Sequence, residues 1–199
     1  MAAKYRSFLK SLASTTKCIL SISPQGDQNS PAFLEISPNN KIPAIIDRDN
    51  GMSLMESGAI LVYLAEKYGK FLPKGGAARA GVNEWLMWQM GGFGPILGQA
   101  HHFLHFNPGK SDYAEARFRS EVARLYGVLD RRLEERDYIC DDYSIADMAC
   151  WPWVSRYEWQ QVNLADYPNV RSWYQRLLAR DAVQKGYHVP KHMGEIPQG

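Results

Sequence analysis

The sequence predicts a mixed α/β part over residues 1–74 followed by an all-helical part over residues 75–199. Two observations predict this division. Before residue 74, short apolar runs alternate with turn-forming residues, whereas later segments carry apolar residues at the spacing of amphipathic helices. A Pro-Lys-Gly-Gly run at 73–76 separates the two patterns, because proline and glycine commonly interrupt regular elements.

The first part is expected to begin with a helix, a strand and a loop. Apolar residues at helical spacing predict the helix over residues 5–12. The run Cys-Ile-Leu-Ser-Ile at 18–22 predicts a buried strand, and Cys18 is therefore expected in the core. Residues 23–31 hold two prolines, a glycine and several polar residues, which predicts a loop.

A hairpin and a helix are expected to complete the first part. Residues 43–46 and 52–55 predict its two strands, and Asn50-Gly51 between them is a strong turn signal because glycine tolerates a positive φ. Ser57 is the expected N-cap of the helix that follows.

The second part is expected to consist of helices. One covers residues 82–105, and the Gly-Gly-Phe-Gly-Pro run at 91–95 is expected to bend or break it. A long amphipathic helix covers residues 113–136. Ser144, with an aspartate three positions later, resembles a capping box that opens an apolar helix, and residues 170–178 form a further helix.

The composition excludes several classes of protein. Of the 199 residues, 45% are apolar and 12% aromatic, which excludes a disordered chain. A net charge of +2 is too small to predict a nucleic-acid partner, and no apolar run predicts a membrane helix. Charged residues interrupt the first twenty positions, so no secretory signal is expected. Three cysteines without CxxC spacing favour a reducing, cytoplasmic compartment.

Two neighbouring motifs suggest a binding site. A cis bond before Pro43 would leave the backbone N–H and C=O of Ile42 free to pair with an extended peptide. Glu56-Ser57-Gly58 opens a helix, whose N–H groups and dipole favour a carboxylate. Together the motifs suit a small peptide with a free carboxylate. From the residues alone, the alternative is an ordinary turn proline and an ordinary helix cap.

Four segments resemble the glutathione S-transferase superfamily over about residues 4–180. Ser-Pro-Asn-Asn-Lys-Ile-Pro-Ala at 37–44 and Leu-Met-Glu-Ser-Gly-Ala-Ile at 54–60 are similar to its thioredoxin-like domain. The segments at 88–103 and 143–153 resemble, within the all-helical domain, the bacterial disulfide-bond oxidoreductases of the nu-class type. The resemblance implies a thioredoxin-like glutathione-binding domain over residues 1–74 and an all-helical domain over residues 75–199.

The resemblance also implies glutathione as co-substrate, in the reduction of small disulfides or in transfer to electrophiles. Gln28 would contact glutathione, and Ile42 would pair with its cysteinyl part beside a cis Pro43. Glu56 and Ser57 would hold the γ-glutamyl end. For Gln28 the alternative is a surface loop residue.

Arg117 falls where this branch places an arginine that reaches the ligand across a homodimer. A guanidinium suits a carboxylate because it donates a planar fork of hydrogen bonds. The alternative is a solvated helix charge. Three histidines at 101, 102 and 105 have no carboxylate or cysteine at close spacing, so no metal site is expected.

The catalytic residue is left unknown by the resemblance. In the family, a first strand and loop supply the group that activates the glutathione sulfur, and here Lys4 already matches the first helix. Two interpretations compete: a mis-assigned or truncated start, or a degenerate member that binds glutathione as a non-catalytic or regulatory protein. The amine of Met1 is a speculative substitute for the lost group.

Overall fold

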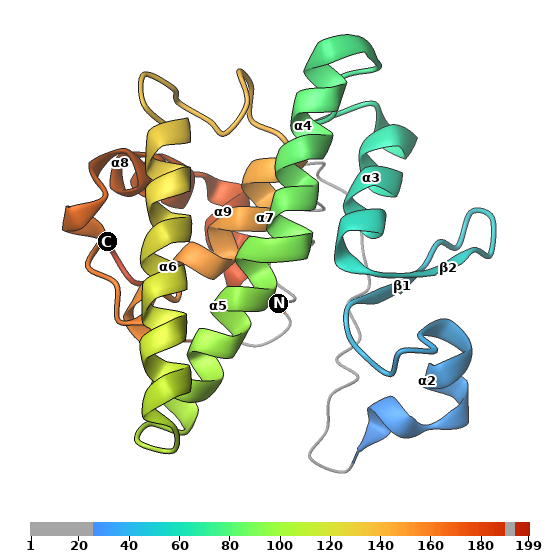
Figure 1. Ribbon diagram of the computed structural model, residues 1–199. Coiled ribbons are helices and arrows are strands. Elements are labelled where there is room, and N and C mark those ends of the chain that lie inside the picture. The colour runs from blue at the N-terminus through green and yellow to red at the C-terminus, as the bar shows by residue number, and fades with distance from the viewer. Residues whose placement is uncertain (1–25, 190–193) are drawn as a thin grey trace.

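The computed structural model describes residues 26–189 and 194–199, and it places a small α/β part beside a bundle of helices (Figure 1). The α/β part holds η1 (Asp27–Asn29), α2 (Pro31–Ile36), β1 (Ala44–Ile46), β2 (Ser53–Met55) and α3 (Ser57–Tyr68). The bundle holds α4 (Gly76–Trp88), η2 (Gln89–Phe93), α5 (Gly94–Ala100), η3 (His101–Phe106), α6 (Asp112–Arg132), α7 (Ile145–Val154), η4 (Tyr157–Gln160), η5 (Leu164–Asp166), α8 (Pro168–Leu178) and α9 (Asp181–Tyr187). The expected α/β part followed by helices is confirmed. The helix expected over 5–12, the strand over 18–22 and the substitute role of Met1 lie outside the described residues.

The expected hairpin is confirmed, although its loop is longer than a two-residue turn. β1 and β2 pair antiparallel, with Ile45 opposite Leu54. The Asp47 N–H bonds the Met52 carbonyl at 2.8 Å, and Gly51 takes a positive φ of 72°. The Asp47 carboxylate and the Asn50 amide oxygen each accept a backbone N–H two residues on, at 3.0 Å. These side-chain turns stabilise the longer loop.

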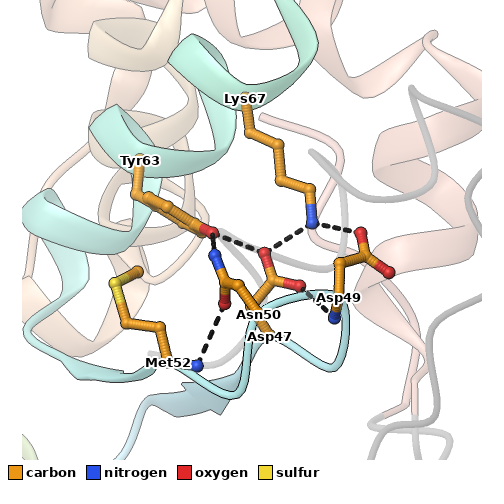
Figure 2. A network of polar contacts seen from close by, with 6 residues as sticks. All are labelled: Asp47, Asp49, Asn50, Met52, Tyr63 and Lys67. Atoms are coloured by element: carbon orange, nitrogen blue, oxygen red, sulfur yellow. Dashed lines mark hydrogen bonds and ion pairs between the residues drawn. The ribbon is translucent and has the colours of Figure 1, made fainter.

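Polar contacts tie this loop to α3 (Figure 2). The Tyr63 hydroxyl and the Lys67 ammonium both donate to one oxygen of Asp47, each at 2.5 Å. Lys67 also reaches Asp49 at 2.5 Å, and Asn50 donates to the Tyr63 hydroxyl at 3.0 Å. The loop is therefore fixed to the face of α3 by a connected network.

Helix α2 was not predicted, because its start lies inside the expected loop over 23–31. Ser30 accepts a hydrogen bond from the Phe33 N–H at 3.3 Å, and Pro31 occupies the first helical turn. Proline fits there because the N–H that it lacks has no partner within the helix. The proline that suggested a loop thus begins a helix.

The core lies mainly in the helical part. Trp173, Tyr126, Tyr174 and Phe93 are its largest fully buried side chains. Helix α6 buries the face that its apolar spacing predicts, and it ends at Arg132, four residues before the predicted end. The buried members of that face are Val122, Leu125, Leu129 and Leu133.

The capping box that opens α7 is confirmed. The Ser144 side chain accepts from the Ala146 N–H at 3.3 Å, and the Asp147 carboxylate accepts from the Ser144 N–H at 2.9 Å. Both residues are buried, so these backbone N–H groups at the start of the apolar helix are hydrogen-bonded without water.

The glycine-rich run at 91–95 does not break the chain's helical path. Instead, α4 passes into α5 through the π-helical turn η2, and α5 passes into η3 in the same way (Figure 1). Glycines 91 and 92 have open space where a side chain would lie. A π-helical turn accommodates one additional residue within an α-helix, and such turns are frequent at functional sites.

Candidate functional site

A cavity of about 460 Å³ lies between the α/β part and the helical part. This volume is within the range of small-ligand sites. The α/β side contributes Ser37, Asn39, Lys41, Ile42, Pro43, Met55, Glu56 and Ser57. The helical side contributes Gln89, Met90, Gly94, Pro95, Gly98, Gln99 and Trp153. The two motifs that the sequence singled out therefore meet in one wall.

The first motif enters β1 through a cis Ile42–Pro43 bond. The Ser37 hydroxyl donates to the Lys41 carbonyl at 2.8 Å and so fixes the preceding loop. The first ladder pair joins Ala44 to Met55, so the backbone groups of Ile42 lie before the paired stretch. An extended ligand backbone can pair with such groups at a strand's edge.

The second motif begins α3, but Ser57 is not its N-cap. Glu56 occupies the cap position with a φ of 68°, and Ser57 is the first helical residue. The expectation that Ser57 caps the helix was wrong because the chain turns sharply at Glu56. A non-glycine residue at positive φ is uncommon, and such conformations cluster at ligand sites. The Ser57 hydroxyl donates instead to the Met90 Sδ atom at 3.2 Å.

The helical wall of the cavity was missed from the sequence. Trp153 of α7 packs on two glycines of α5: a Cβ atom at Gly94 would lie 3.3 Å from its indole, and one at Gly98 would lie 3.6 Å away. The Gly94 Cβ would also lie 2.4 Å from Gln89 Nε2, so a side chain at this position would force the end of Gln89 to shift. The four-residue spacing of these glycines, which allows a close approach, was the available signal.

Comparison with known proteins decides the family. The sequence-family model of the glutathione S-transferase N-terminal domain matches residues 12–74. The family model of the C-terminal domain matches residues 93–181. Disulfide-bond oxidoreductase YfcG of Escherichia coli is 52% identical over 165 residues, which cover 80% of this chain and 77% of that protein. The chain belongs to the glutathione S-transferase family.

Solved glutathione transferases share its fold. One from Burkholderia graminis, with two glutathione molecules bound per subunit, superimposes with a TM-score of 0.89 at 39% identity, covering 96% of this chain and 85% of that one. One from Pseudomonas putida, with a glutathione disulfide bound per subunit, gives 0.88 at 40% identity, covering 94% and 86%. The α/β part is therefore a thioredoxin-like domain with a small two-stranded sheet, followed by the transferase helical domain, as the sequence predicted.

Two residues expected at the glutathione transferase site do not line the cavity. Gln28 lies in η1, where its side-chain oxygen is buried. Arg117 is exposed on α6. The cavity thus unites four of the six expected binding residues, namely Ile42, Pro43, Glu56 and Ser57.

Two histidines of the helical part, His101 and His105, pack among aromatic rings. His101 stacks on Trp153 with ring centroids 5.7 Å apart, and His105 stacks on Trp159 at 4.4 Å. The Nε2 atom of His101 lies 3.0 Å from the side-chain nitrogen of Gln160. Burial, then the charges of Arg156 and His105, lower the pKa of His101 to about 4. The ring is therefore neutral near pH 7 and accepts the hydrogen bond from Gln160.

The two cysteines in the described ranges, 26–189 and 194–199, are both buried. Cys150 is fully buried in α7. Burial raises the pKa of the Cys140 thiol, which disfavours its reactive thiolate form. In the same ranges, no three His, Cys, Asp or Glu residues are grouped to hold a metal ion, and no helix is long and apolar enough to cross a bilayer.

Proposed function

We propose that this chain binds glutathione in the cavity and uses it to reduce small disulfides. The observation that carries the proposal is the meeting of the Ile42–Pro43 edge with the start of α3 in one wall. The bound glutathione and glutathione disulfide in the two solved relatives support the ligand, and the name of the E. coli relative supports the reaction.

In this proposal, different groups of the cavity bind different parts of glutathione. The backbone of Ile42 pairs with the cysteinyl part, beside Pro43. The Ser57 hydroxyl and the free N–H groups in the first turn of α3 bind the γ-glutamyl carboxylate, aided by the helix dipole. The Glu56 carboxylate pairs with the γ-glutamyl ammonium, because it lines the same cavity and carries the opposite charge.

The reaction proceeds in two thiol–disulfide exchanges. The glutathione thiolate attacks one sulfur of the substrate disulfide, forms a mixed disulfide and releases the other half as a thiolate. A second glutathione thiolate attacks the mixed disulfide, which releases the remaining half and leaves glutathione disulfide. N–H donors near the sulfur would lower the pKa of the thiol and raise the thiolate fraction. The residue that activates the sulfur stays unassigned.

The proposal includes a cytoplasmic homodimer with a glutathione-binding domain over residues 1–74 and a helical domain over 75–199. Arg117 would reach a ligand bound in the partner protomer, which is consistent with its exposure on α6. Gln28 would reach the ligand from the η1 turn. Light scattering with and without glutathione tests the dimer.

The test is glutathione-dependent reduction of 2-hydroxyethyl disulfide, with Ser57→Ala beside the parent. Loss of one hydrogen bond to a carboxylate is expected to weaken glutathione binding about tenfold. Calorimetry measures that affinity. Ser53→Ala is the matched control, because Ser53 is exposed on β2 and does not line the cavity.

The outcomes separate the candidate functions. Turnover that falls in Ser57→Ala but not in Ser53→Ala supports a disulfide reductase. Glutathione binding without turnover of disulfides supports the non-catalytic, regulatory alternative, and turnover of electrophiles alone supports a transferase. Absence of glutathione binding contradicts the proposal.

A further inference from the structure

Met90 lies where the proposed site holds the carboxylate end of glutathione. It belongs to the turn η2 and lines the cavity, and its Sδ atom accepts the Ser57 hydroxyl at 3.2 Å. A Cβ atom at Gly58 would lie 3.1 Å from Met90 Cγ and 3.4 Å from its Sδ. The thioether therefore rests directly on the first turn of α3.

We propose that Met90 is an oxidation site that controls the affinity for glutathione. A peroxide transfers one oxygen to the thioether sulfur, which is oxidised by two electrons to the sulfoxide, while the peroxide is reduced to water or an alcohol. The effect on affinity rests on the proposed glutathione site, whereas the oxidation itself does not.

The consequence follows from the contacts of the sulfur. A sulfoxide oxygen is a stronger hydrogen-bond acceptor than a thioether sulfur, so it holds the Ser57 hydroxyl more firmly. That hydroxyl has one hydrogen and cannot donate to the sulfoxide and to a ligand carboxylate at once. The added oxygen also takes up space beside Gly58, next to the first turn of α3, where the carboxylate of the ligand would bind.

Other methionines among the described residues are placed differently and provide controls. Met55 lines the same cavity, but its sulfur lies 3.9 Å from Ser37 Oγ, which already donates to the Lys41 carbonyl. Met87 is 56% exposed on α4 and does not line the cavity. Met55 therefore controls for oxidation within the cavity, and Met87 for oxidation at the surface.

The experiment treats the full chain with hydrogen peroxide, removes the peroxide with catalase, and measures the Kd for glutathione by calorimetry. Peptide mass spectrometry locates each added oxygen. The parent, Met90→Leu, Met55→Leu and Met87→Leu are each compared with themselves before treatment. Leucine keeps a similar volume but has no sulfur to oxidise.

Treatment is expected to weaken binding about tenfold in the parent, Met55→Leu and Met87→Leu, and to leave the affinity of Met90→Leu unchanged. Methionine sulfoxide reductases should restore the parent. Two results overturn the inference: Met90 remaining a thioether when Met87 is fully oxidised, or an equal loss in Met90→Leu. Failure of the untreated parent to bind glutathione instead contradicts the proposed function.

Discussion

The ring of His101 is kept neutral by its surroundings. It stacks on Trp153, faces a donating amide of Gln160, and has a pKa lowered to about 4, first by burial and then by the charges of Arg156 and His105. An unfolded histidine has a pKa near 6.5. Between these values the unfolded chain binds a proton that the folded chain does not, so stability falls as the pH falls through this window.

Replacing His101 with glutamine should flatten that part of the stability profile. Between pH 7 and pH 5 the parent is expected to lose more free energy of unfolding than His101→Gln. The difference should be less than the roughly 1.4 kcal/mol per pH unit of a fully sequestered group, because solvent partly screens the ring. Urea unfolding at each pH measures it. His102→Gln, at the exposed next position, is the control; identical profiles for His101→Gln and the parent would contradict the explanation.

At the scale of elements, the start of α7 depends on one carboxylate. Asp147 is fully buried and accepts hydrogen bonds from the Ile139 N–H at 2.9 Å, the Ser144 N–H at 2.9 Å and the Trp173 indole at 2.8 Å. The Asp147 side chain therefore ties the start of α7 to the preceding loop and to α8.

Asp147→Ala should be among the most destabilising single changes in the helical part. It leaves buried N–H groups of three residues without their acceptor, at about 1–3 kcal/mol each, so a total loss of at least about 3 kcal/mol is expected. Denaturant unfolding measures it. Asp141→Ala, an exposed change in the preceding loop, should have little effect. A loss below about 1 kcal/mol for Asp147→Ala would show that the network contributes little.

The loop between β1 and β2 depends on a second carboxylate, that of Asp47. The hydrogen bond from Lys67, then that from Tyr63, lowers the pKa of Asp47 to about 2. The stabilisation is therefore complete above the ordinary aspartate pKa near 4 and is lost as the pH falls towards 2. Asp47→Asn keeps the shape but removes the charge.

Amides of the loop between β1 and β2 should exchange faster with solvent in Asp47→Asn than in the parent. The reason is that Lys67 loses its ion pair with the loop at Asp47 (Figure 2). Hydrogen exchange at pH 7 measures the effect, and Arg48→Gln, exposed in the same loop, is the control. Unchanged exchange in Asp47→Asn would mean that the backbone turn alone fixes the loop.

Local signals predicted most of the elements. The hairpin, α6 and the capping box of α7 follow from apolar spacing and from residues within a few positions of one another. The short helices α2 and α9 were not predicted, because six or seven residues are too few to show a clear helical spacing of apolar residues. The continuous path through 91–95 was not predicted, because α4 packs on α7 and α5 packs on α6, and this packing outweighs the helix-breaking tendency of glycine.

At the scale of the whole molecule, the cavity shows what a sequence can predict about a site. Its α/β wall was predicted because both motifs, the Ile42–Pro43 bond and the start of α3, depend on the backbone conformation of a few neighbouring residues. Its helical wall was not, because Trp153 meets Gly94 and Gly98 only after α7 packs on α5. Arg117 and Gln28 were assigned by resemblance alone, and their roles remain predictions.

The two parts should differ in stability. In the described residues, the sheet consists of two three-residue strands, whereas the large buried aromatic side chains lie in the helical part. Amides of β1 and β2 are therefore expected to exchange by lower-energy openings than amides of α6 and α7. Native-state hydrogen exchange measures this. Uniform protection across both parts would mean that they unfold as one cooperative unit.

The π-helical turn η2 makes the position of the helical wall depend on the number of residues in the segment as well as on their identity. Each residue advances an α-helix by about 100°. Deleting Gly91 would return the turn to regular spacing and rotate the face carrying Gly94, Pro95 and Gly98 relative to α4. A one-residue deletion could thus abolish ligand binding while the helix itself persisted. In the divergence of such chains, insertions and deletions within residues 89–93 would reshape the cavity more abruptly than substitutions do.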